Sequence, residues 1–145
     1  MGDRTYCNLV IRGKISPERF AELETRINAN SPDADTQPGS GGWGFCEVNY
    51  GEPVNEGFNM QALADEFGVT FIWSWDAGYD YSPGIRFYRP GEPVAEFPYN
   101  GDDITVTVCV SDPGRSFNRL SRAFNFAQIL HSRLDITSDT APTAA

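Results

Sequence analysis

Apolar and polar residues alternate in several short runs along this chain, and each run predicts a β-strand. The first run covers 6–13, where Cys7, Leu9 and Ile11 share the side that we expect to face the core. Further runs of strand character cover 43–50, 69–75, 85–88, 94–97 and 104–110. The last run alternates most clearly, because every second residue from Ile104 to Val110 is apolar and β-branched.

Three other runs have helical periodicity, and each follows a residue that is typical of a helix start. Ser16-Pro17, Asn59 and Asp112-Pro113 can cap free N–H groups, and a proline in the first turn sacrifices no hydrogen bond. The third run predicts the longest helix, over about 113–134. Its apolar stripe, which we expect to face the core, has spacings of three and four and consists of Phe117, Leu120, Phe124, Ala127, Leu130 and Leu134.

The resulting order, β-α-β-α-β-β-β-β-α, has too few helices for a doubly wound parallel sheet and predicts an α+β fold. We expect a two-layer sandwich with a mostly antiparallel sheet, helices on one face, and the other face open to water or a partner. The 145 residues fit one domain, at 1–135. A mobile loop is predicted at 31–42, and a disordered tail at 136–145.

Charge is concentrated in the middle of the chain. Residues 31–113 contain fourteen carboxylates and two arginines, whereas the segments before and after them carry +1 and +2, which gives −9 in total. If about twelve net carboxylates shared one surface, they would match the charge of roughly 20 Å of duplex DNA. This pattern favours a basic protein partner and opposes direct binding of nucleic acid, although acidity for solubility alone gives the same composition.

The residue types present offer little for catalysis. Cys7, Cys46 and Cys109 are odd in number and widely spaced, which predicts buried free thiols in strands. His131 is the only histidine and falls near the end of the last predicted helix, where a positive charge is favoured. We therefore expect no catalytic residues, no metal site and no cofactor. The chain also lacks an apolar run long enough for a membrane helix and a signal-peptide core, so we expect it in the cytoplasm of a bacterial host.

The candidate site lies in the predicted loops. The loop at 76–84 combines exposed tyrosines with carboxylates, and the turn after Asn100-Gly101 adds two more acids. Exposed tyrosines flanked by charge are typical of protein-binding hot spots. The predicted partner-binding residues are Asp76, Tyr79, Asp80, Tyr81, Asp102 and Asp103.

The chain opens with the strand-like segment Tyr6-Cys7-Asn8-Leu9-Val10-Ile11-Arg12-Gly13, and a proline-started helix follows it. This opening resembles a family of small phage-encoded proteins with a ferredoxin-like core. The helix, aromatic strand and glycine-containing hairpin over 62–91 also have the shape of that family. The resemblance implies a ferredoxin-like architecture and an origin in a mobile element. It transfers no catalytic residues.

These observations lead to one principal hypothesis and two alternatives. The chain is similar to anti-CRISPR proteins in general character, which implies a DNA mimic or steric inhibitor of a basic host protein or nucleoprotein complex, such as a CRISPR surveillance complex or restriction enzyme. An alternative is a carbohydrate-binding or hydrolytic domain that uses an aromatic and acidic cluster of Trp73, Trp75, Asp76, Tyr79, Asp80 and Tyr81. A third hypothesis is a self-associating accessory protein that forms a homodimer through the free face of its sheet.

Overall fold

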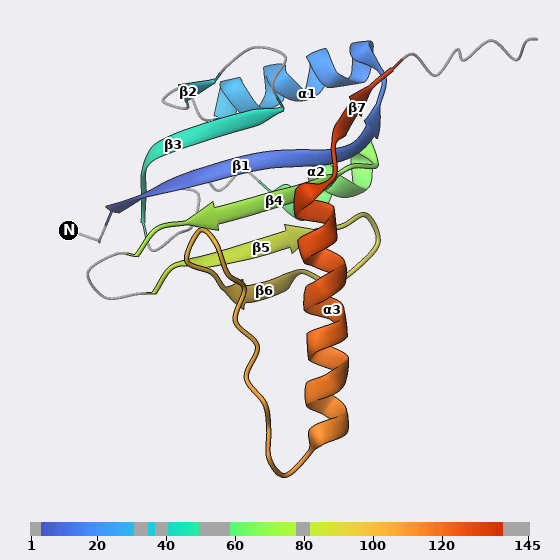
Figure 1. Ribbon diagram of the computed structural model, residues 1–145. Helices are drawn as coiled ribbons and strands as arrows, with labels where there is room; N and C mark the ends of the chain where they lie inside the picture. The colour runs from blue at the N-terminus through green and yellow to red at the C-terminus, as the bar shows by residue number, and fades with distance from the viewer. Residues whose placement is uncertain (1–3, 31–34, 37–40, 50–58, 78–81, 138–145) are drawn as a thin grey trace, which may run out of the picture.

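The computed structural model describes residues 4–30, 35–36, 41–49, 59–77 and 82–137, which form an α+β fold around one mostly antiparallel sheet (Figure 1). The strand order is β2-β3-β1-β4-β5-β6, and β7 pairs with the end of β1 in parallel. The strands are β1 (Arg4–Ile15), β2 (Asp35–Thr36), β3 (Gly42–Asn49), β4 (Thr70–Trp75), β5 (Gly84–Tyr88), β6 (Ala95–Pro98) and β7 (Leu134–Ile136).

The sheet does not have the ferredoxin-like strand order. A ferredoxin-like core is a split βαβ arrangement, in which a helix connects strands that run in parallel. Here β1 is central and both of its long neighbours, β3 and β4, are antiparallel to it. The predicted α+β class and mostly antiparallel sheet are confirmed, whereas the ferredoxin-like topology is not.

Two helices cover the first face of the sheet, α1 (Pro17–Asn30) and α2 (Met60–Phe67). Their predicted starts are confirmed, since Ser16 Oγ accepts a hydrogen bond from Arg19 N at 3.2 Å and Asn59 Oδ1 accepts from Ala62 N at 3.0 Å. Gly68 ends α2 with φ 67°, a backbone conformation that favours glycine. The strand residues beneath these helices include the three predicted core residues Cys7, Leu9 and Ile11, all fully buried.

The third helix, α3 (Pro113–His131), packs on the opposite face, so the expectation that all helices share one face is wrong. Because side chains alternate along a strand, β4 presents Phe71 to the first face and Ile72 to the second. The second face is also apolar, and Phe126 of α3 packs there against Phe87, with ring centroids 4.7 Å apart. Helix α3 thus buries the apolar part of the face that was expected to be open to water or a partner.

The side of α3 that faces the protein is not its apolar stripe. The buried residues of α3 are Ser116, Ala123 and Phe126, whereas Phe117 and Phe124 are exposed. The part of the stripe formed by Phe117, Leu120 and Phe124 therefore lies about 100° around the helix from the buried line, one residue position away. The prediction that the stripe faces the core holds for Leu130 and Leu134, which pack against the core, and is wrong for Phe117, Leu120 and Phe124. The Phe126 ring cluster and Ser116 determine which side of α3 contacts the sheet and the preceding segment.

The segment 104–110 does not form the predicted strand. It begins as a hairpin with β6, through the bridge between Tyr99 and Ile104 and the bond from Thr105 N to Pro98 O. It then leaves β6, and Cys109 N donates to Ser116 Oγ at 2.6 Å. In Figure 1, this segment runs beside the N-terminal half of α3, which extends past β6. The backbone thus bonds to α3 where the alternating pattern predicted a sheet partner.

The C-terminal region differs from the prediction by a few residues. Helix α3 ends at His131 and not at 134, and Leu134 and Ile136 belong to β7 beside Gly13–Ile15. Ile136, predicted to begin the tail, is therefore part of the sheet, while 138–145 lie outside the described residues. Within the predicted loop 31–42, Asp35–Thr36 pair with β3.

Candidate functional site

Two of the predicted site residues, Asp102 and Asp103, lie in a tightly bonded turn after β6. Asn100 Oδ1 accepts hydrogen bonds from the backbone N–H groups of Asp102 at 2.9 Å and Asp103 at 2.7 Å. Gly101 has φ 100°, a value that side chains disfavour, and its carbonyl accepts from the Tyr99 hydroxyl at 2.9 Å. The turn is held by Asn100 and the backbone, so both carboxylates are left exposed to solvent.

Asp76 lies at the same end of the sheet as this turn. It is exposed and directly follows β4, and it lines a cleft together with Asn100 and Gly101. The structure therefore brings together two loops that the sequence could place only separately. Tyr79, Asp80 and Tyr81, the remaining predicted site residues, lie outside the described residues.

The acidic turn lies in a negative local field. No ion pair joins Asp102 or Asp103 to a basic side chain within the described part of the chain. The pKa of the Tyr99 hydroxyl is raised, first because the group is partly desolvated and second because of the nearby Asp102 charge. Two unpaired carboxylates on a rigid turn can accept hydrogen bonds from an arginine or lysine without first breaking bonds within the protein.

The aromatic residues of the carbohydrate hypothesis are less accessible than that hypothesis needs. Trp73 is fully buried in the core. Trp75 is partly buried, and its Nε1 donates to Ser82 O at 3.0 Å while Arg86 stacks over its ring. Trp73 therefore serves packing, and the described part of the proposed sugar site reduces to Trp75 and Asp76.

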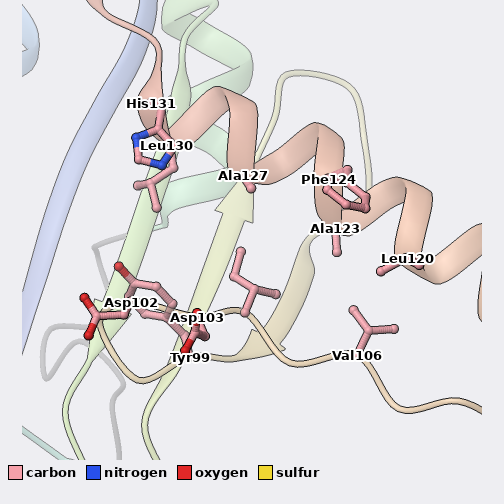
Figure 2. Close-up of a pocket in the computed structure, with 11 residues that line it drawn as sticks. Tyr99, Asp102, Asp103, Val106, Leu120, Ala123, Phe124, Ala127, Leu130 and His131 are labelled. Atoms are coloured by element: carbon pink, nitrogen blue, oxygen red, sulfur yellow. The ribbon is translucent and has the colours of Figure 1, made fainter.

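An apolar groove lies between α3 and the 99–106 segment. Its volume is about 270 Å³, and its walls include Leu120 and Phe124 on α3 and Val106 on the facing segment. Figure 2 shows Asp102 and Asp103 at one end of this groove, opposite His131. The groove therefore connects the acidic turn with the exposed side of α3.

Beyond the groove, exposed apolar residues lie on α3 and on the 104–110 segment, which the bond from Cys109 N to Ser116 Oγ ties to the start of α3. We call these residues the α3 apolar face. Its five residues are between 45% and 92% exposed, and they are Val108, Val110, Phe117, Leu120 and Phe124. Contiguous exposed apolar surface on a protein commonly marks an interaction site. We missed this surface from the sequence because the helical stripe and the alternating valines both resembled core positions.

Other groups offer limited chemistry. Among the described residues, no set of three or more histidine, cysteine or acidic side chains could hold a metal ion. Cys7 is buried as predicted, but Cys109 is partly exposed and outside any strand, which contradicts its predicted burial. The side chain of Cys46 lies outside the described residues. Arg119 and Arg122 line a separate cleft with Glu96, on the other side of α3 from the apolar face.

Comparison with known proteins gives no relative: no family model, curated protein or solved structure matches this chain. In the described ranges, none of the helices combines the length and the apolar character that a membrane crossing requires. The functional argument therefore depends on the geometry and charge of the surfaces described above.

Proposed function

We propose that this protein is a small acidic binding protein that docks onto a basic partner through the acidic end of its sheet. The observation that carries the proposal is the position of Asp102 and Asp103, exposed and without a described ion pair, on a turn that Asn100 holds rigid. Preorganised carboxylates lose little conformational entropy on binding, so more of each new charge-assisted bond contributes to affinity.

The position of Asp76 supports the same surface. It follows β4 and lines a cleft with Asn100 and Gly101 of the acidic turn, while Asp102 and Asp103 line the neighbouring groove beside α3. Exposed charges more than about 8 Å apart are largely screened at physiological salt, so the local field at this end comes mainly from neighbouring carboxylates such as Asp102 and Asp103. A partner that presents arginine or lysine side chains to this end would gain several bonds together.

The partner class follows from charge. With a net charge of −9, the protein attracts basic surfaces, and the most basic protein surfaces in a cell are those that handle nucleic acid. The specific form of the proposal is an inhibitor of a host defence complex, such as a CRISPR surveillance complex or restriction enzyme, acting in the bacterial cytoplasm. Inhibition requires only that this protein occupy the nucleic-acid-binding groove of its partner, so it needs no catalytic residue.

The test reverses the two best-placed charges. Bacteria that carry individual CRISPR or restriction systems would express the wild type or the Asp102→Lys/Asp103→Lys variant, and resistance to phage would be measured. We expect the wild type to lower resistance in at least one system. We expect the variant to lose this effect and its purified form to bind the target complex at least tenfold more weakly, with a steep dependence on salt.

A matched control separates the effect of charge at the acidic turn from the effect of the net charge of the protein. Glu18→Lys/Asp135→Lys makes the same change in net charge at two exposed acids on α1 and β7. This control should retain inhibition, and both variants should melt close to the wild type. Full inhibition by the Asp102→Lys/Asp103→Lys variant, or equal loss in the control, would contradict the proposed surface.

A further inference from the structure

The α3 apolar face is too large to be explained as scattered surface residues. Phe117 and Phe124 are 67% and 63% exposed, and Val110 is 92% exposed. Phenylalanine side chains each bury about 150–250 Å² when covered, so the five residues together expose on the order of 500 Å². This equals the largest apolar patches found on typical monomers, which are commonly functional.

The arrangement of the face suits a second helix. Phe117, Leu120 and Phe124 are spaced by three and then four residues, and this spacing forms a straight seam along one side of α3. The helix positions along one side of the seam are uncharged, namely Asn118, Ser121, Asn125 and Gln128. A helix packed along this seam would meet apolar and neutral polar side chains, without burying an unpaired charge.

The charge distribution permits a second copy to approach on this side. Residues 104–131 contain one aspartate and three arginines, a net +2, so the remaining residues carry −11. The face thus belongs to the least acidic part of the molecule. Two copies that meet along α3 in opposite directions would keep their acidic sheets at opposite ends of the pair.

We propose that the α3 apolar face binds a second copy of this chain, with the two α3 helices packed antiparallel about a two-fold axis near Leu120. In a two-fold interface the same patch meets itself, so Phe117 of one copy would pack near Phe124 of the other. The two faces together would bury about 1,000 Å², the lower limit for a specific protein interface. The proposal goes beyond the proposed function and uses the α3 side of the groove, across from Asp102 and Asp103.

The first test is a cysteine cross-link at the axis. In a two-fold pair, a residue at the axis lies beside its own copy, so Leu120→Cys in a Cys109→Ser background should form a disulfide-linked dimer under mild oxidation. Arg122→Cys in the same background lies on the other side of α3 and should give little dimer. The Cys109→Ser protein alone controls for Cys7 and Cys46.

The second test measures self-association without a new cysteine. In sedimentation equilibrium, the wild type should form a dimer as its concentration rises, and Phe117→Ser/Leu120→Ser should weaken association at least 100-fold. Val94→Ser removes an apolar side chain that is 49% exposed outside the α3 apolar face, and it should associate like the wild type. Because the two seam residues are exposed, their replacement should leave the fold intact.

The outcomes distinguish this proposal from the proposed function. A wild type that stays monomeric, or equal cross-linking at positions 120 and 122, would overturn the α3 pairing and leave the face to a different protein. Neither result depends on the host target, since only purified protein is measured. Conversely, Asp102→Lys/Asp103→Lys could lose inhibition while the dimer persists, which would support both proposals as separate surfaces.

Discussion

At the residue scale, Cys109 has surroundings that a lone cysteine in a sequence does not reveal. Its Sγ lies 3.2 Å from Ser111 Oγ, and the thiol is partly exposed beside the start of α3. The pKa of Cys109 is lowered, first by the side-chain hydrogen bond from Ser111, then by the backbone N–H groups of Ser111 and Asp112, with a smaller effect of the Arg119 charge. Hydrogen bonds to sulfur favour the thiolate, which is the reactive form.

We therefore expect alkylation of Cys109 to reach its half-maximal rate at a lower pH than for an ordinary thiol, whose pKa is about 8.5. Ser111→Ala should move the midpoint upward, because it removes the largest cause of the shift. The measurement is the pH dependence of iodoacetamide labelling at Cys109, followed by peptide mass spectrometry, with Cys7 as the buried reference. An identical midpoint in the two proteins would contradict this role of Ser111.

At the scale of elements, one phenylalanine determines how α3 docks. Phe126 packs against Phe87 and Phe97, with ring centroids 4.7 Å and 5.8 Å away, and Arg122 lies over its outer side. At the other end of the contact, Arg12 Nε donates to the Leu130 carbonyl in the last turn of α3, at 3.3 Å. These contacts orient α3 on the second face and leave Phe117, Leu120 and Phe124 of its apolar stripe exposed.

Two substitutions in the same helix should thus differ widely in cost. Phe126→Ala removes a buried ring from an aromatic cluster and should lower the free energy of unfolding by about 3–5 kcal/mol. Phe124→Ala removes an exposed ring and, at protein concentrations low enough to avoid self-association, should change it by less than about 0.5 kcal/mol. Urea denaturation of both variants measures the difference. Similar losses would mean that Phe124 is also a core residue.

At the scale of the whole molecule, α3 has two roles on two different sides of the helix. Its buried line closes the second apolar layer, and its exposed stripe continues into the valines of the 104–110 segment. A surface that binds only the folded state stabilises that state by mass action, so stability depends on the concentration of the partner.

Pairing through α3 should make the melting temperature rise with the concentration of the protein itself. Phe117→Ser/Leu120→Ser should melt at the same temperature at low and high concentration, because it has lost the seam. Differential scanning calorimetry at two concentrations measures both. A wild-type melting temperature that does not change with concentration would contradict dimerisation at those concentrations.

The local patterns predicted most elements but not their partners. Eight of the nine predicted strand and helix runs, among them β1, β4 and all three helices, correspond to elements of the structure, because caps, prolines and alternation act within a few residues. The strand predicted at 104–110 is absent. Its alternating pattern is compatible with a sheet, but the Cys109 N–H group bonds to Ser116 of α3 and not to a neighbouring strand. Of the candidate site, the sequence predicted the acidic loops and missed the α3 apolar face.

The sequence by itself determined the helix caps, the core face of β1 and the acidic middle of the chain, because each depends on residue type and short spacing. Only the tertiary structure decided which face of the sheet α3 covers, which side of α3 is buried, and that Asp76 and the Asp102–Asp103 turn share one end. Those features depend on contacts between residues far apart in the chain, such as Phe87 with Phe126, and a periodic pattern cannot tell an apolar stripe that meets the core from one that meets a partner.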